Sequence, residues 1–287
     1  MKGLLSTILL ATVAAAPATA QSGSHRGSDE QGIVRAAMDY MEGAVTADAD
    51  RVARGVHEEL NKVVVTTLHQ TGRQVLSYNT HTTLVEIVRG LAEQMADVDP
   101  SVEVTVFDVG NDIASARAVG QLWYDYLQLA KIKGEWRIVN VLWARNQSNA
   151  ASELDQGVLE SDRAAVETAA LDYIAGAYSG DADRMERALH PELNKVLLNR
   201  HRQTGEQFLY KMGASNLIEG TRAGLGKLDE DERQIELETY DISKGIAAVK
   251  VTSALYIDHL QLAKVNSAWK IINVLWVPNP NASQPGG

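Results

Sequence analysis

The chain has 287 residues, a net charge of −10 and no cysteine. An acidic protein is repelled by phosphate backbones, which argues against a nucleic-acid partner, and the lack of thiols excludes disulfides, cysteine nucleophiles and lipoprotein attachment sites. Because single domains usually span about 100–150 residues, this length favours two domains.

Residues 1–20 are the first predicted element, a secretory signal peptide. One cation, Lys2, precedes an apolar run from Leu4 to Ala16, and the small residues Ala18-Thr19-Ala20 stand before Gln21. This pattern predicts cleavage after residue 20 and a periplasmic or secreted protein. The apolar run is shorter than the roughly 20 residues that cross a bilayer, so no membrane span is expected.

A first domain is predicted over residues 30–146. Apolar residues at helical spacing predict helices over residues 30–45 and 82–96, and Asp48 is a good N-cap for a short helix between them. Alternating or β-rich runs predict about six strands, the last four contiguous. The final two strands form a hairpin over residues 123–143, turning at Lys133-Gly134.

The whole domain recurs 133 residues later. Residues 123–143, WYDYLQLAKIKGEWRIVNVLW, return at residues 256–276 as YIDHLQLAKVNSAWKIINVLW. This tandem duplication predicts a second domain over residues 162–279, a polar linker over residues 147–161 and a C-terminal tail over residues 280–287. The element order favours an α+β class with helices on one face of a curved antiparallel sheet.

The Asp39-Tyr40 pair on the first helix, the HPEL stretch at residues 190–193 and the closing hairpin resemble the nuclear transport factor 2-like (NTF2-like) superfamily. Within it, the hairpin resembles exported bacterial proteins described as putative lumazine-binding or SnoaL-like. The resemblance covers residues 31–146 and 164–279. It implies two tandem cone-shaped domains, each with three helices and a pocket under its curved sheet, paired through their sheets as an intramolecular pseudo-dimer.

A distant similarity to ketosteroid isomerase, of the same superfamily, implies pocket residues. Tyr40 and Tyr173 keep the position of its oxyanion tyrosine, and Asp125 and Asp258 resemble its second donor, a protonated aspartate. The resemblance implies that each Tyr and Asp donate to one ligand oxygen. No carboxylate stands where that enzyme has its catalytic base, because the matching residues are Val64 and Leu197.

Four further pocket candidates are His57 and His190, where the second helix leads into the first strand, and Asn140 and Asn273 on the hairpins. Each candidate also has a structural reading: a tyrosine can pack with a satisfied hydroxyl, an aspartate can bond its own turn, and a histidine can be a structural hydrogen-bonding group. No set of three or four convergent metal ligands is visible, so neither a metal nor a cofactor is expected.

These observations favour an exported, non-catalytic pocket protein that binds a small hydrophobic or heterocyclic molecule. One alternative is an isomerase, dehydratase or cyclase that uses a Tyr/Asp oxyanion pair with a histidine base. The other is an assembly or scaffold module with vestigial pockets. No catalytic residue is assigned. Apolar hairpin residues are expected to form the contact between the domains, namely Val141, Trp143, Val274 and Trp276.

Overall fold

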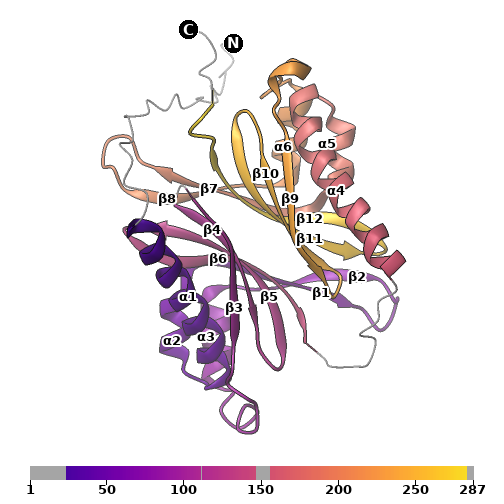
Figure 1. Ribbon diagram of the computed structural model, residues 1–287. Coiled ribbons are helices and arrows are strands. Elements are labelled where there is room, and N and C mark those ends of the chain that lie inside the picture. Colours follow the sequence, from indigo (N-terminus) through magenta and orange to yellow (C-terminus); the bar gives the residue numbers. More distant parts are fainter. Residues whose placement is uncertain (1–23, 111, 147–155, 283–287) are drawn as a thin grey trace, which may run out of the picture.

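The computed structural model describes residues 24–110, 112–146 and 156–282 and consists of two similar halves (Figure 1). The predicted signal peptide, most of the predicted linker and the last five residues of the predicted tail lie outside the described residues. In chain order the first half contains α1 (Ser24–Val45), α2 (Ala49–Gly55), β1 (Val56–Thr67), β2 (Gln74–Asn79), α3 (His81–Arg89), β3 (Glu103–Gly110), β4 (Ile113–Val119), β5 (Trp123–Ile132) and β6 (Glu135–Arg145).

The second half repeats this order, with one added 3₁₀ turn. It contains α4 (Gln156–Ser179), α5 (Ala182–Ala188), β7 (Leu189–Arg200), β8 (Gln207–Met212), α6 (Ala214–Arg222), η1 (Glu230–Glu232), β9 (Glu236–Ser243), β10 (Ile246–Thr252), β11 (Tyr256–Val265) and β12 (Ala268–Pro278). The predicted α+β class, with two tandem halves of the same element order, is confirmed.

Each half has one six-stranded sheet, in the order β2-β1-β6-β5-β4-β3 and β8-β7-β12-β11-β10-β9. Neighbouring strands are antiparallel except β1 with β6 and β7 with β12, which are parallel. The sheets are therefore mixed. A hairpin turn forces its two strands to be antiparallel, but β1 and β6 are joined through most of the domain, so no turn sets their relative direction.

Two element boundaries differ from the sequence-based predictions. The third helix ends at Arg89 rather than near residue 96, because Gly90 ends it and its backbone N–H bonds the carbonyls of Ile87 and Val88. The fourth helix begins at Gln156, inside the predicted linker. The Asp48 N-cap is confirmed, since its side chain accepts a hydrogen bond from the backbone N–H of Arg51.

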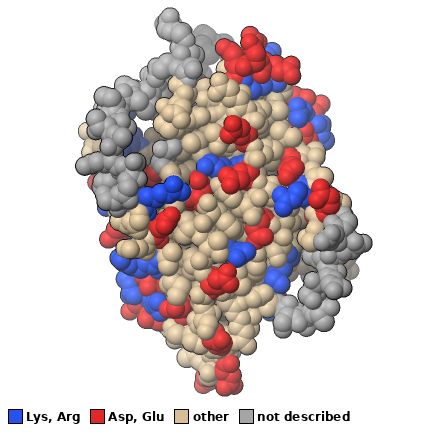
Figure 2. Space-filling view, in the orientation of Figure 1, with Lys and Arg blue, Asp and Glu red and all other residues tan. Residues whose placement is uncertain are grey.

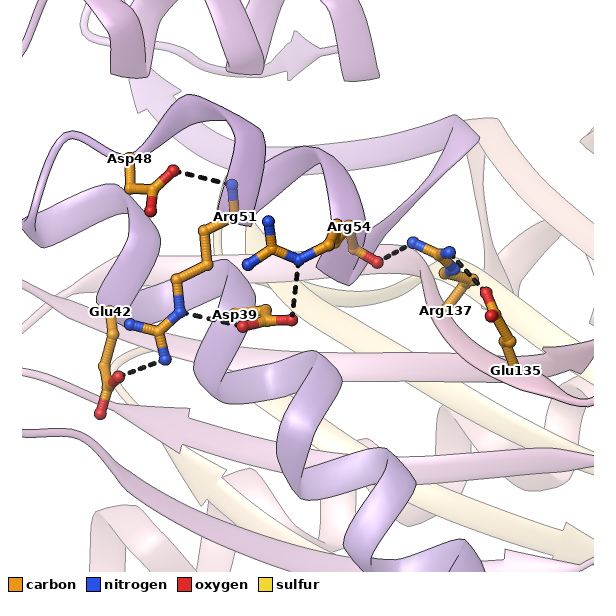
Figure 3. A network of polar contacts seen from close by, with 7 residues as sticks. All are labelled: Asp39, Glu42, Asp48, Arg51, Arg54, Glu135 and Arg137. Atoms are coloured by element: carbon orange, nitrogen blue, oxygen red, sulfur yellow. Dashed lines mark hydrogen bonds and ion pairs between the residues drawn. The ribbon is translucent and has the colours of Figure 1, made fainter.

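An ionic network ties α1 to α2 (Figure 3). Arg51 on α2 donates to Asp39 on α1 at 2.9 Å and to Glu42 at 2.5 Å, and Arg54 lies 3.8 Å from Asp39. Arg137 of β6 in turn donates to the backbone carbonyl of Arg54. The helix that carries Tyr40 is thus held both to its neighbour and, through α2, to the sheet.

The two sheets face each other in the middle of the molecule, with the helices on the outside (Figure 1). The Phe107 and Tyr240 rings, which occupy equivalent positions in the repeat, stack at 5.1 Å across the contact. Apolar side chains from both halves, such as Val63, Leu142, Ile246 and Ile272, form one buried cluster there. This is the pairing implied by the family resemblance.

The hairpin face that makes this contact is the opposite of the expected one. Val141 and Trp143 pack with the helices of their own half, as do Val274 and Trp276. Successive strand residues point to opposite faces of a sheet, so the neighbouring residue Leu142 meets the other half instead. The expectation for these four residues was wrong by one register position.

Candidate functional site

Each half encloses a triad of tyrosine, lysine and aspartate between its helices and its sheet. In the first half Tyr40 comes from α1, Lys62 from β1 and Asp125 from β5. The Tyr40 hydroxyl donates to Asp125 Oδ2 at 2.5 Å, and Lys62 Nζ donates to the same oxygen at 3.1 Å and to the Tyr40 hydroxyl oxygen. Lys62, the most exposed of the three, is 7% exposed.

The second half repeats the triad with Tyr173, Lys195 and Asp258. Tyr173 donates to Asp258 Oδ1 at 2.8 Å, and Lys195 Nζ donates to the same oxygen at 2.8 Å and to the Tyr173 hydroxyl oxygen. The aspartates are fully buried in both halves. The same closed arrangement therefore forms twice from equivalent positions.

Burial and mutual contact shift the pKa values of these groups. Burial raises the pKa of Asp125, and the nearby Lys62 and Tyr40 oppose that rise. Burial likewise lowers the pKa of Lys62, opposed by Asp125. The pKa of Tyr40 lies well above its ordinary value, first because the phenol is buried and second because Asp125 repels a phenolate. Tyr40 is therefore a neutral hydroxyl donor.

This geometry differs from the pair of donors implied by ketosteroid isomerase. One carboxylate oxygen of Asp125 accepts from both Tyr40 and Lys62, which suits an ionised aspartate beside an ammonium ion. Tyr40 consequently points its proton at Asp125, and the two do not aim jointly at a third atom. The cause is Lys62, which brings a positive charge into the site.

A tryptophan covers each buried lysine. Lys62 Nζ lies 4.6 Å from the ring centroid of Trp143, and Lys195 Nζ lies 4.6 Å from that of Trp276. An ammonium ion over an indole face is attracted by the ring quadrupole, by about 2 kcal/mol when the site is dry. The indole therefore replaces part of the hydration that the lysine loses.

One acceptor and one donor in each triad region remain unpaired. Asp125 Oδ1 and Trp143 Nε1 are buried and have no hydrogen-bond partner among the described residues, and the same is true of Asp258 Oδ2 and Trp276 Nε1. Asp125 faces Trp143 directly across the β5–β6 ladder, as Asp258 faces Trp276 across β11–β12. Directly opposed side chains leave one face of a sheet about 5 Å apart at Cβ. Each half thus offers an acceptor beside a donor.

The histidine candidates lie apart from the triads. His57 is partly buried, and its Nδ1 accepts from the backbone N–H of Glu59; His190 does the same with Glu192. Burial lowers the pKa of His57, while Glu59 and Glu58 raise it and Lys211 and Arg137 add to the lowering. None of these neighbours belongs to a triad, and the geometry is that of a structural hydrogen-bonding group.

Asn140 and Asn273 lie in the contact between the two sheets. Asn194 donates to Asn140 at 2.8 Å, Asn140 to Gln128 at 2.8 Å, and Gln128 to the backbone carbonyl of His259 at 2.7 Å. The equivalent series of hydrogen bonds in the repeat runs from Asn61 through Asn273 and Gln261 to the Tyr126 carbonyl. These amides link the halves and do not contact the triads.

Sequence reasoning missed the lysines. Lys62 and Lys195 are identical in the two copies and sit two positions after Leu60 and Leu193, which are buried against the helices. Because strand residues alternate, that spacing places each lysine on the inner face of its sheet. A lysine at an inward position needs a buried counter-charge, which would have singled out Asp125 and Asp258.

Within the described ranges, no group of three or more His, Asp or Glu side chains could hold a metal ion, and no helix is long and apolar enough to cross a membrane. Figure 2 shows basic and acidic side chains interspersed over the face in view, without a large region of one sign. Inside each half, the lysine charge is balanced by the adjacent aspartate.

Comparison with solved structures finds NTF2-like proteins that each match about one half of the chain. One from Silicibacter pomeroyi is 17% identical, covering 42% of this chain and 98% of its own, with a TM-score of 0.36. One from Shewanella baltica is 19% identical, covering 42% and 97%, with a TM-score of 0.33. A putative scytalone dehydratase from Novosphingobium aromaticivorans is 11% identical, covering 42% and 87%, with a TM-score of 0.31.

No curated protein matches the chain. A family model does: the one described as "Putative lumazine-binding" matches residues 28–144 and again residues 161–277. The two matches coincide with the two halves of the structure and together cover most of the chain. The chain therefore belongs to the "Putative lumazine-binding" family, with two tandem copies of the family's domain.

Proposed function

We propose that the chain is an exported, non-catalytic binding protein that takes one small heterocyclic molecule in each half. Three features support this function. The first 20 residues have the pattern of a cleaved leader. The family description names a heterocycle. Each half also holds an unpaired acceptor beside an unpaired donor.

The proposal rests on two directly opposed residues in each half that keep an unpaired acceptor and an unpaired donor. These atoms are Asp125 Oδ1 and Trp143 Nε1 in the first half, and Asp258 Oδ2 and Trp276 Nε1 in the second. A cyclic amide or imide presents an N–H next to a carbonyl. Its N–H would donate to the aspartate and its carbonyl would accept from the indole. Each buried polar group left unpaired costs about 1–3 kcal/mol, so a ligand that pairs both regains that cost.

The lysine determines which hydrogen-bonding groups of a ligand the site accepts. Lys62 keeps Asp125 an acceptor by stabilising the carboxylate, so the site selects a ligand N–H over a second acceptor. Because Lys62 is itself paired, the ligand does not need a negative charge. The ligand class is therefore a neutral lactam or imide ring, of which lumazine, a pteridine-2,4-dione, is one example.

The site is enclosed, which affects how a ligand enters. Tyr40 is 2% exposed and Asp125 is 0% exposed. A ligand that reaches Asp125 must pass between the helix layer and the sheet, so association should be slower than for an open site.

The enzyme alternative is not favoured. It requires a histidine base, and both His57 and His190 instead accept hydrogen bonds from the backbone near the start of β1 and β7. A general base must come within hydrogen-bond reach of the proton that it removes.

Calorimetric titration with lumazine tests the proposal. We expect two equivalents per chain. Trp143→Phe keeps an aromatic ring over Lys62 but removes the indole donor, so one of the two sites should weaken by about 5- to 150-fold, the equivalent of the 1–3 kcal/mol for an unpaired buried carbonyl. Trp136→Phe is the matched control, because its Nε1 bonds Asp29 instead.

The variant that combines Trp143→Phe with Trp276→Phe should lose both sites. If it binds lumazine as the unaltered chain does, the proposed recognition is wrong. If the unaltered chain binds neither lumazine nor a simpler cyclic imide such as uracil, the proposed ligand class is wrong.

A further inference from the structure

A groove of about 770 Å³ lies where the first half meets the hairpin tips of the second. It is bordered by the ends of β1 and β6, by the β9–β10 turn and by the β11–β12 turn. Small-molecule sites commonly have volumes of about 300–1,000 Å³, so the groove is large enough for a metabolite.

The edge of the groove is fixed by hydrogen bonds between the halves. The backbone N–H of Gln74 donates to Asn266 Oδ1 at 2.9 Å, and the backbone N–H of Asn266 donates to Gln74 Oε1 at 2.7 Å. Because these two residues come from different halves, the groove exists only when the halves are paired. A preformed site requires less ordering when a ligand binds.

All the ionisable residues that line the groove are cations: Arg145, Lys244 and Lys264. Lys264 pairs with Asp162 at 2.7 Å. Arg145 is exposed, and its side chain has no ion pair or hydrogen bond with any described residue. Among the described residues, the ammonium of Lys244 contacts only the face of Tyr124, at 5.9 Å from the ring centroid. Two of the three cations are therefore available to a ligand.

This grouping runs against the charge of the chain, which is −10 overall. A cleft lined by one sign of charge concentrates ligands of the opposite sign. The remaining lining includes the apolar side chains of Val65, Ala144 and Ile246. An occupant that suits both parts has an anionic group and a compact apolar body.

The two available cations have no counterpart at the opposite seam, where the hairpin tips of the first half meet the second half. The positions equivalent to Lys264 and Thr67 are Lys131 and Arg200, so that seam is not without cations. The residues equivalent to Arg145 and Lys244 in the repeat are Pro278 and Asn111, both uncharged. The opposite seam therefore lacks both of these cations, although the hairpins there also cross between halves, with the Lys133 backbone N–H donating to Gln207 at 2.7 Å. The two seams of the duplicated chain thus differ in the charge of their lining.

We propose that this groove is a binding site, separate from the two triads, for a small organic anion with an apolar ring, and that it binds one molecule per chain. Arg145 and Lys244 supply the charge, and Val65 and Ile246 supply the apolar contact. Carboxylates and phosphates share the required chemistry. Trp143 lines the groove as well, but the inference does not depend on the proposed function, since the cations and apolar contacts that it uses belong to neither triad.

The test is calorimetric titration of the full chain at low salt with three compounds that share one ring system: 1-naphthoate, 1-naphthyl phosphate and neutral 1-naphthamide. We expect one equivalent of each anion to bind, and 1-naphthamide to bind at least about 10-fold more weakly. Tighter binding of either the phosphate or the carboxylate supports the site and identifies which anionic group it prefers. Equal binding of the amide and both anions overturns the proposal.

Variants locate the site. Arg145→Gln and Lys244→Gln should each weaken anion binding about 2- to 5-fold, the range for partly exposed charge pairs, and together about 10-fold. Lys133→Gln, which removes one exposed cation at the opposite seam, is the matched control and should change little. If Lys133→Gln has the same effect as Lys244→Gln, the groove is not the site. Tyr40→Phe with Tyr173→Phe, which alters both triads at residues that do not line the groove, should leave one equivalent of anion bound.

Discussion

Replacing Lys62 with methionine is the most informative perturbation of the triad. The change keeps a long apolar side chain but removes the ammonium that donates to Asp125 and Tyr40. Hydrogen bonds to charged groups contribute about 1.5–3 kcal/mol each, and breaking a buried ion pair costs about 3–5 kcal/mol because one charge stays buried alone. We therefore expect Lys62→Met to lower the free energy of unfolding by about 3–5 kcal/mol at pH 7.

The loss of stability caused by Lys62→Met should become smaller as the pH falls. Burial already raises the pKa of Asp125, and Lys62 is the main influence that opposes the rise, so the variant raises this pKa further. A carboxyl whose pKa is higher in the folded than in the unfolded state makes the protein less stable as pH rises from the unfolded pKa, about 3.9, through the folded pKa. The difference in the free energy of unfolding between Lys62→Met and the unaltered chain should thus be smallest below about pH 4.

Urea denaturation followed by tryptophan fluorescence, from about pH 4 to about pH 8, measures both effects. Lys211→Met is the matched control: it removes the same charge from a pair with Glu59 that is about half exposed, and should cost about 0–1 kcal/mol at any of these pH values. The reasoning is refuted if Lys62→Met costs no more than Lys211→Met, or if its cost does not shrink as the pH falls.

The remaining predictions concern the interface, the caps and the leader. Cutting the chain between residues 147 and 155 should leave two halves that co-elute in size-exclusion chromatography, because buried amides and apolar side chains link them; two separate monomers would contradict this. Asn140→Leu should weaken that association, since it removes the donor to Gln128 Oε1 and the acceptor of Asn194 Nδ2. Asp48→Ala should destabilise the chain by about 1 kcal/mol in thermal unfolding, through loss of the α2 cap. Mass spectrometry of the exported protein should show Gln21 as the first residue. A mass that includes residues 1–20 would contradict the predicted cleavage.

Much of the fold follows from local sequence. Turn residues, helix caps and apolar spacing mark the elements, and the constant 133-residue offset marks the duplication. The turn at Lys133-Gly134 has positive φ at both positions, 52° and 86°, as a tight two-residue hairpin requires. Such features depend only on neighbouring residues, so they can be recognised without a structure.

What sequence did not reveal depends on contacts between distant residues. Trp143 was expected at the interface, but the choice between the two faces of β6 depends on which face the helices cover. Asn140 was a pocket candidate and instead bonds Asn194 of the other half. Tyr40 and Asp125 do meet, but Lys62 changes which atom donates. Strand alternation marks Lys62 as an inward residue, whereas its contacts with Tyr40 and Asp125 follow only from the placement of β1 in the sheet.

Indole nitrogen spectra of the ¹⁵N-labelled chain test the central claim most directly. The chain has five tryptophans, and four of their N–H groups divide into two pairs. Trp143 and Trp276 have no partner among the described residues, whereas Trp136 and Trp269 donate to Asp29 and Asp162. On addition of lumazine, the indole signals of Trp143 and Trp276 should move downfield as each N–H gains an acceptor, while those of Trp136 and Trp269 stay in place. Unmoved signals from Trp143 and Trp276 at saturating lumazine would contradict recognition at these two sites.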